Sequence, residues 1–184
     1  MQVMVVGTGT LGGNLAEHLA RTRPGWQLSL IDCDRVEERN LNNQPYFQHQ
    51  VGKSKVESLA ENLFRIGGQR PHTTHKRLTA GNAARLIQAF DLVVDCLDNH
   101  EGRLALQQAA RHHGQRLLHL GLAPDYVEAI WDGHYRVPPD VPRDPCADPL
   151  SRSLSLVAIL LFEKALETGS NYCCTTGDLS LSQL

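Results

Sequence analysis

The sequence predicts an α/β fold with a doubly wound, mainly parallel sheet, helices on both faces of the sheet, and antiparallel strands toward the C-terminal end. Short apolar runs alternate with segments of helical spacing through most of the 184 residues. This alternation is typical of parallel strands that are joined by helices. A chain of this length has room for one main core, so we predict a single domain over residues 1–184.

The apolar runs predict seven strands, the first of which ends at a glycine. In chain order they are Gln2–Val6, Gln27–Ile31, Thr73–Leu78, Phe90–Cys96, Arg116–Leu120, Tyr126–Trp131 and Tyr172–Leu181. The fourth run holds three consecutive apolar residues, Leu92, Val93 and Val94, which suits a strand that is buried on both faces. The last run is expected at an edge of the sheet.

Apolar residues spaced three and four positions apart predict five helices. In chain order they are Leu11–Arg21, Lys53–Ile66, Gly81–Gln88, Glu101–His113 and Ser151–Glu167. Pro24 and Gly25 end the first helix, and Gly67 and Gly68 end the second. The polar stretch 32–50 has no such period and is expected to be a long loop, as is the proline-rich stretch 138–149.

The charge balance and the apolar runs exclude several classes of function. Lys and Arg number 18 and Asp and Glu number 20, so the net charge is −2 and no overall basic field exists for nucleic acid or an anionic membrane. The longest apolar run, Leu154–Phe162, is far below the roughly 20 residues of a membrane span. The five cysteines form no CxxC pair, so we expect reduced thiols, no structural zinc site and a cytoplasmic protein.

A glycine-rich turn follows the first predicted strand and opens the first predicted helix. Gly7, Gly9 and Gly12 have the GxGxxG spacing of nucleotide-binding turns. Glycine lets the backbone approach a phosphate, and the free N–H groups of the helix N-terminus attract it. Asp32 lies 20 residues after Gly12, where a carboxylate can accept hydrogen bonds from ribose hydroxyls. The glycines could instead serve only to tighten the connection between strand and helix.

Polar residues further along the chain suit a nucleoside triphosphate. Asn40 lies in the 32–50 loop and can donate to phosphate oxygens, and Lys55 offers a point charge for the β- and γ-phosphates. Asp98 follows the strand Phe90–Cys96, where its carboxylate could hold Mg²⁺ with those phosphates or could cap the next helix. An NAD-dependent oxidoreductase would show the same first 32 residues, but it would not require this loop or Asp98.

Together these motifs resemble the adenylation domain shared by ThiF, MoeB and the ubiquitin-activating enzymes. The resemblance covers residues 3–99 and depends on the GxGxxG turn, on Asp32 and Asp34, and on three further blocks. The blocks are Asn40-Leu41-Asn42-Asn43-Gln44, Val51-Gly52-Lys53-Ser54-Lys55 and Asp95-Cys96-Leu97-Asp98-Asn99. The resemblance implies a Rossmann-like fold, ATP and Mg²⁺ as cofactors, and an ATP-dependent adenylyltransferase that activates a carboxylate as an acyl adenylate.

In that family the activated carboxylate is usually the C-terminal glycine of a ubiquitin-like or sulfur-carrier protein. The resemblance therefore implies such a partner, or a small-molecule carboxylate, and a homodimer. It gives catalytic roles to Lys55, Asp98 and Arg39, with Asp98 as the Mg²⁺ ligand. Nucleotide contacts are expected from Gly7, Gly9, Thr10, Leu11, Gly12, Asp32, Asp34, Asn40, Asn43, Gln44, Lys55, Leu97, Asp98 and Asn99.

The sequence departs from the family where positive charge is expected. Family members have an arginine at the position of Asn43, and an amide lacks the full charge. They also have an N-terminal helix that lends an arginine to the partner's site, whereas the first predicted strand here begins at Gln2. Arg35 and Arg39 could compensate, or another subunit could supply the charge. The alternative is a non-catalytic nucleotide- or carrier-binding subunit that partners an active homologue.

Two further features allow more than one interpretation. Cys146 precedes the last predicted helix, in a region where some family members use a cysteine to take over the acyl group. It could have that covalent role or be a loop thiol without one.

The apolar stripe of the last predicted helix could pack in the core, or part of it could form a dimer interface.

Overall fold

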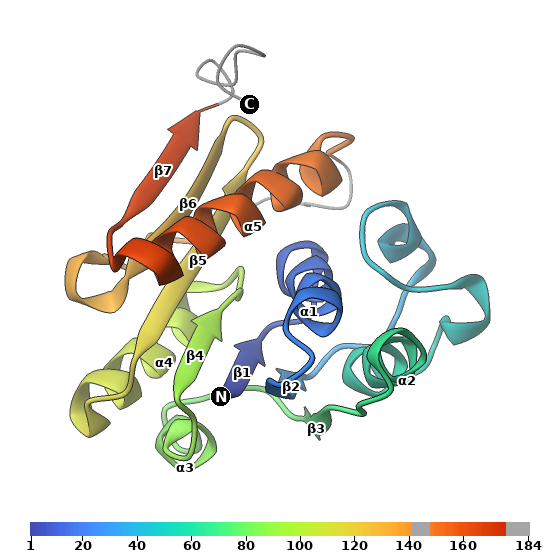
Figure 1. Cartoon of the computed structure of the whole chain (residues 1–184), viewed down its shortest axis with the longest axis horizontal. Coiled ribbons are helices and arrows are strands. Elements are labelled where there is room, and N and C mark those ends of the chain that lie inside the picture. The colour runs from blue at the N-terminus through green and yellow to red at the C-terminus, as the bar shows by residue number, and fades with distance from the viewer. Residues whose placement is uncertain (141–147, 176–184) are drawn as a thin grey trace.

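The computed structural model describes residues 1–140 and 148–175. Its elements confirm the predicted α/β fold (Figure 1). In chain order they are β1 (Gln2–Val6), α1 (Thr10–Thr22), β2 (Gln27–Asp32), η1 (Glu38–Asn42), η2 (Gln48–Gln50), α2 (Lys55–Gly67), β3 (His72–His75), α3 (Ala83–Ile87), β4 (Leu92–Asp95), α4 (His100–His113), β5 (Leu117–Ala123), β6 (Tyr126–Trp131), η3 (Asp132–His134), α5 (Ser151–Thr168) and β7 (Tyr172–Thr175).

The described strands form one sheet in the order β3-β2-β1-β4-β5-β6-β7. The strands from β3 to β5 in this order are parallel, and β6 and β7 are added antiparallel. The chain therefore moves outward from β1 to β3 and then crosses to β4 on the other side of β1. In such sheets ligands bind outside the carboxyl ends of the strands where this direction changes, which here is between β1 and β4.

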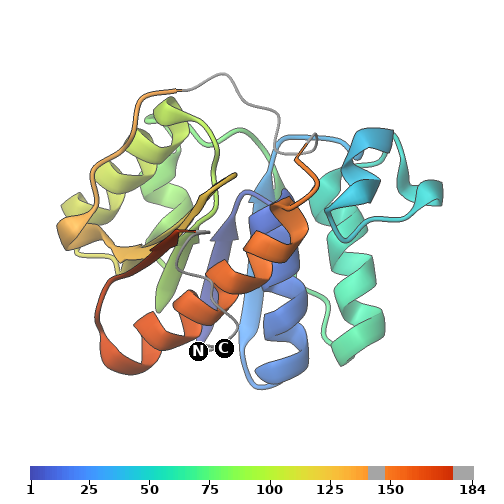
Figure 2. The ribbon, with the colours of Figure 1, turned by 90° about the horizontal axis from the view of Figure 1, so that it is seen from above.

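Helices cover both faces of the sheet (Figure 2). α1, α2 and α5 pack on one face, where Leu15 and Phe162 join Val3 of β1 in one buried cluster. α3 and α4 pack on the other face, where Leu106 joins Val6 of β1 in a second cluster. Neighbouring residues of a strand face opposite sides of a sheet. Because both sides of β1 are covered, its sequence is a continuous apolar run rather than an alternating one.

Several boundaries differ from the prediction. The 32–50 loop contains the two short 3₁₀ helices η1 and η2. At their starts, Asn40 Oδ1 accepts from the N–H of Glu37 at 2.9 Å, and Gln50 Oε1 accepts from the N–H of Phe47 at 3.0 Å. β3 ends at His75 rather than at Leu78, because Leu78 leaves the edge of the sheet and packs into the cluster beneath α3 and α4. β5 continues to Ala123 rather than ending at Leu120, because its last residues pair with β6.

Parts of two predictions fall outside the described residues. β7 is described as far as Thr175, so the remainder of the predicted strand Tyr172–Leu181 is not covered. Cys146 is not covered either. Within the described ranges, none of the helices combines the length and the apolar character that a membrane crossing requires.

Candidate nucleotide-binding site

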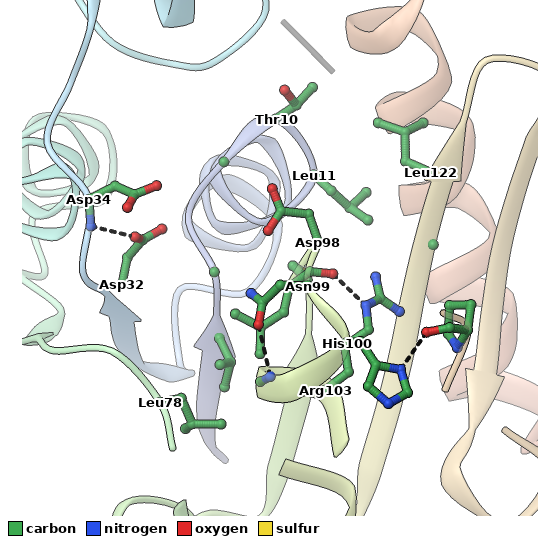
Figure 3. Close-up of a pocket in the computed structure, with 18 of the residues that line it drawn as sticks. Thr10, Leu11, Asp32, Asp34, Leu78, Asp98, Asn99, His100, Arg103 and Leu122 are labelled. Carbon is green, nitrogen blue, oxygen red and sulfur yellow. Dashed lines mark hydrogen bonds between the residues drawn. The ribbon is translucent and has the colours of Figure 1, made fainter. Parts of the chain in front are cut away.

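A cavity of about 870 Å³ lies at the carboxyl ends of β1, β2, β4 and β5. One part, which we call the glycine-loop half, is lined by the turn after β1, by the residues that follow β2 and by Lys55. The other part, the β6 half, is lined by the end of β5, by β6 and by residues 135, 136 and 138–140. Asp98 lies between Asp32 and Asp34 on one side and Leu122 on the other (Figure 3). The cavity therefore joins the expected nucleotide site to a second, adjoining space.

The glycine turn has the geometry that phosphate binding requires. Gly7 has a φ of +87°, and a Cβ there would lie 2.8 Å from the backbone oxygen of Cys96. A side chain at Gly9 would meet nothing closer than 4.0 Å, so the backbone is open toward the cavity. Gly9 precedes α1, and no side chain caps the first N–H groups of that helix. Such uncapped N–H groups at a helix N-terminus favour an anion.

The carboxylate of Asp32 is fixed against this turn. Thr8 donates to Asp32 Oδ2 from its backbone N–H at 2.7 Å and from its hydroxyl at 3.0 Å. The backbone N–H of Asp34 donates to Asp32 Oδ1 at 2.8 Å. A carboxylate oxygen can accept more than one hydrogen bond, so both oxygens can still accept from ribose hydroxyls. Asp32 is the last residue of β2, which is where the sequence predicted it.

Lys55 and Arg39 bring positive charge to the glycine-loop half. Lys55 is the first residue of α2 and is buried, and its Nζ lies 3.3 Å from Asp34 Oδ2. Arg39 lies on η1, and its Nε pairs with Glu37 Oε2 at 2.6 Å. Arg35 does not line the cavity, because its guanidinium donates to the backbone oxygen of Gly52. Of the two arginines that the sequence offered as compensation, the structure therefore places only Arg39 at the site.

Asp98 is exposed to the cavity and does not cap α4. The helix cap is Asn99, whose Oδ1 accepts from the N–H of Gly102 at 2.8 Å. Within residues 1–140 and 148–175, the Asp98 carboxylate has no hydrogen bond and no ion pair. Of the two predicted roles of Asp98, the cap is therefore excluded, and the carboxylate is available for a ligand. An exposed carboxylate beside a phosphate site suits Mg²⁺, which is commonly held by one or two carboxylates together with substrate phosphates.

A buried network holds the backbone of Leu97, the residue just before Asp98. The N–H of Leu97 donates to Asp95 Oδ1 at 2.9 Å, and its backbone oxygen accepts from Arg103 Nε at 2.6 Å. Arg103 also donates to the backbone oxygen of Leu120 and to the hydroxyl of Tyr135. The N–H and the backbone oxygen of Leu97 are thus held by charged groups on β4 and α4. These contacts fix the direction in which the chain leaves β4 and therefore the place of Asp98.

The same network contains a histidine between two carboxylates. His119 on β5 is fully buried, with Nδ1 2.7 Å from Asp95 Oδ2 and Nε2 3.2 Å from Asp132 Oδ1. Its ring stacks on Tyr135 at a centroid distance of 3.7 Å. His119 thus links the carboxylates of Asp95 and Asp132, and the chain of contacts continues to Arg111, whose Nε lies 2.7 Å from Asp132 Oδ2.

These contacts shift the acidity of both carboxyl groups. Burial alone would raise the pKa of Asp95, but the charge of Arg103 and the hydrogen bond from His119 outweigh burial and lower it. Burial likewise opposes ionisation of Asp132, and hydrogen bonds from Arg111, Gln107 and His119 lower its pKa. Both groups are therefore ionised at neutral pH. They contribute to stability above their ordinary pKa, and this contribution is lost as the pH falls through the lowered values.

The cavity gathers most of the residues that the sequence selected. Those that line it are Gly7, Gly9, Thr10, Leu11, Asp32, Asp34, Arg39, Asn40, Gln44, Lys55, Leu97, Asp98 and Asn99. Gly12 and Asn43 do not. A Cβ at Gly12 would lie 1.9 Å from the backbone oxygen of Gly7, so this glycine permits close packing of helix and strand. Asn43 is buried, and its backbone oxygen accepts from Asn14.

Sequence reasoning did not select Arg103, His119, Asp132 or Tyr135. One signal was available for His119, which is a polar residue inside the otherwise apolar run 117–122. Its two carboxylate partners follow from the pairing of β5 with β4 and with η3, which a single sequence does not reveal.

Potential metal ligands gather in one place within the described residues. Asp32, Cys33 and Asp34 offer ligand atoms within 4.8 Å of one another, and Asp98 is not part of this group. Asp98 could therefore hold Mg²⁺ only together with oxygens from a phosphate ligand and from water, as is usual for this ion. The donor set fits a magnesium ion that arrives with a nucleotide, and it does not form an all-protein cage.

Comparisons with known proteins agree with the family resemblance. Residues 1–156 match the ThiF family. Ubiquitin-like modifier-activating enzyme 5 of Branchiostoma floridae is 32% identical over 180 residues, which cover 90% of this chain and 42% of that protein. Adenylyltransferase and sulfurtransferase MOCS3 of Drosophila persimilis is 38% identical over 109 residues, which cover 58% of this chain and 24% of that protein.

A solved structure with a similar fold holds a nucleotide. It is E. coli tRNA N6-threonylcarbamoyladenosine dehydratase, TcdA, in complex with ATP. Its TM-score to this chain is 0.62 at 30% sequence identity, over 68% of this chain and 55% of the solved one. The chain thus spans less than two thirds of the length of each of these three proteins.

Proposed function

Because the chain belongs to the ThiF family, we propose that it is an ATP-dependent adenylyltransferase that activates a carboxylate as an acyl adenylate. The observation that carries this proposal is the position of Asp98. Its exposed carboxylate, which is unpaired among the residues that the structure describes, lies between the glycine-loop half and the β6 half of one cavity. A metal ion held there with a triphosphate would lie where a nucleotide in one half meets a second substrate in the other.

Each part of the glycine-loop half suits one part of ATP. Asp32 would accept from the ribose hydroxyls, and the first N–H groups of α1 would donate to phosphate oxygens. Lys55 would neutralise charge on the β- and γ-phosphates. Mg²⁺, held by Asp98 and phosphate oxygens, would neutralise charge and orient the triphosphate. A similar solved structure binds ATP, which supports this assignment.

The reaction needs positioning more than proton transfer. A carboxylate oxygen of the substrate would form a bond to the α-phosphorus, while the bond from that phosphorus to the bridging oxygen breaks and pyrophosphate leaves with the electron pair. The attacking carboxylate is already ionised at neutral pH, so no general base is required. The contribution of this site would be alignment of the two substrates and stabilisation of the charge on the leaving pyrophosphate.

The substrate would be the C-terminus of a ubiquitin-like or sulfur-carrier protein, or a small-molecule carboxylate. The names of the relatives support a protein substrate, since they include a modifier-activating enzyme and a sulfurtransferase. We further propose that the protein acts in the cytoplasm as a homodimer.

ATP–pyrophosphate exchange tests the proposed reaction. We expect Mg²⁺-dependent exchange with at least one carrier protein or small carboxylate, and we expect Asp98→Ala and Lys55→Ala to abolish it while both variants still fold. A suitable control is Glu167→Gln, because Glu167 is an exposed residue near the end of α5 and does not line the cavity. Full exchange in both cavity variants would show that these residues do not form the catalytic site.

A second function is favoured by one observation. Asn43, at the position of the family's phosphate-contacting arginine, is buried and does not line the cavity. The site therefore lacks a cation at that position, as a non-catalytic nucleotide- or carrier-binding subunit would. Nucleotide binding without exchange on the full panel would support this function, and exchange by the isolated chain would exclude it.

A further inference from the structure

The β6 half of the cavity contains a carboxylate held in a fixed place. Glu128 lies on β6 directly opposite Gly121 of β5. A Cβ at Gly121 would lie 2.5 Å from Glu128 Oε1 and 2.6 Å from its Cγ, so the Glu128 side chain lies across the space that Gly121 leaves open. The hydroxyl of Tyr126 donates to Glu128 Oε2 at 2.8 Å. The Glu128 carboxylate thus packs against β5, and one of its two oxygens accepts a hydrogen bond from Tyr126.

The other oxygen of Glu128 is available to a ligand. Within the two described ranges, Oε1 has no hydrogen-bond donor. Both Glu128 and Tyr126 line the cavity, together with the ring of Tyr135. Burial raises the pKa of Tyr135 to about 12, and the charge of Glu128 contributes to this increase. Glu128, Tyr126 and Tyr135 therefore line the same cavity.

Among the described residues, the other charged groups of this half do not neutralise Glu128. Arg103 is already directed to backbone oxygens and to the hydroxyl of Tyr135. Asp140 adds a second carboxylate, which accepts from the N–H of His100 at 2.6 Å. Arg136 lines the cavity, and within the described residues it forms no ion pair with Glu128. It could instead face the carboxylate of a substrate.

The negative charge of Glu128 disfavours binding of a substrate whose only charged group is its carboxylate. The substrate of an adenylyltransferase is an anion that meets a triphosphate, and Glu128 would repel both. The repulsion becomes attraction if the substrate also has a positive group that reaches Oε1. A hydrogen bond between two charged groups is roughly twice as strong as one between neutral groups. Glu128 would thus favour an ammonium group over a neutral N–H.

We propose that Glu128 selects a substrate that bears a protonated amino group next to the carboxylate that is activated, as an α-amino acid does. This inference rests on the adenylation proposed above and names the substrate class of that same cavity. The ammonium group would donate to Glu128 Oε1, and Tyr126 would keep the carboxylate from turning away. The carboxylate of the same substrate would then point toward Asp98 and the nucleotide.

The binding of stable acyl-adenylate analogues can measure the contribution of the β6 half separately from that of the glycine-loop half. Glycyl-, propionyl- and N-acetylglycyl-sulfamoyladenosine share one nucleoside and differ only in the acyl group. Propionyl has a methyl where glycyl has an ammonium, and N-acetylglycyl has a neutral N–H like that of a peptide. We expect calorimetry on the full chain to show glycyl binding about tenfold more tightly than propionyl, as for a partly exposed charge-assisted hydrogen bond.

Two variants test whether Glu128 causes this preference. In Glu128→Gln the ratio of the glycyl to the propionyl affinity should fall toward one, because the neutral amide lacks the negative charge that strengthens the hydrogen bond from the ammonium. Gly121→Ala should have a similar effect, because its methyl group displaces the flexible Glu128 side chain from its seat. The matched control is Glu167→Gln, which removes the same charge from an exposed position on α5 and should leave the ratio unchanged.

The outcomes separate this inference from the proposed function. Equal binding of the glycyl and propionyl analogues, together with binding of AMP, would overturn the role of Glu128 and leave adenylation in place. If the N-acetylglycyl analogue binds most tightly, the proposed selection for an ammonium group is wrong, and the result indicates a peptide C-terminus as the substrate. No binding of AMP, ATP or any analogue would overturn the proposed function and this inference with it.

Discussion

Replacing His119 with leucine should destabilise the fold strongly and loosen the Asp98 loop. The change removes two hydrogen bonds to carboxylates, of 2.7 and 3.2 Å, and a ring stacked on Tyr135 at 3.7 Å. Each hydrogen bond to a charged group contributes about 1.5–3 kcal/mol, and the stacked ring pair about 0.5–1.5 kcal/mol. Asp95 keeps Arg103 and the N–H of Leu97, which reduces the cost of leaving its oxygen without His119, so we expect a net loss of about 3–5 kcal/mol.

Urea denaturation measures this loss as a decrease in the free energy of unfolding. The matched control is His134→Leu, an exposed histidine in η3 beside the same network, which should change stability by less than about 0.5 kcal/mol. Since Asp95 also holds the Leu97 peptide, His119→Leu should weaken Mg²⁺-dependent ATP binding as well. A destabilisation below about 1 kcal/mol would refute the argument, because the buried carboxylates would then not depend on His119.

Three further predictions concern the glycine turn, the network and the cap of α4. Gly12→Ala should cost about 3 kcal/mol in chemical denaturation, because the new Cβ would lie 1.9 Å from the Gly7 oxygen, whereas Gly25→Ala meets nothing within 4 Å and should have little effect. The free energy of unfolding should fall as the pH drops below about 4, because the pKa of Asp95 is lowered from 3.8 in the folded state. Asp95→Asn should flatten that part of a pH series of urea midpoints, and an unchanged profile would argue against the network. Asn99→Ala should lose about 1 kcal/mol by thermal denaturation, and no loss would mean that the cap contributes little.

The glycine-loop half of the site could be predicted from sequence because its parts are local. The spacing of Gly7, Gly9 and Gly12 indicates a strand, a tight turn and a helix, and Asp32 follows at the end of the next strand. Parallel strands bring their carboxyl ends to one edge of a sheet. The positions of Lys55 and Asp98 at the same edge therefore follow from the order of elements.

The remaining parts depend on contacts that a single sequence does not specify. Gly12 was predicted to contact the nucleotide, but its motif position equally suits helix packing, and the structure shows the packing contact. In the sequence Asn43 lies between Asn40 and Gln44, which both line the cavity, yet the local turn buries Asn43. Glu128 and Gly121 meet only through the antiparallel register of β5 and β6. Their pairing depends on tertiary structure and not on local periodicity.

The measurement that tests the central claim most directly is calorimetric binding of ATP to the purified chain with and without Mg²⁺. The site described here predicts that Mg²⁺ increases the affinity for ATP about tenfold, that Asp98→Asn removes this increase, and that NAD binds more weakly than ATP. An Mg²⁺ effect that persists in Asp98→Asn, tighter binding of NAD, or no binding of ATP would contradict the account.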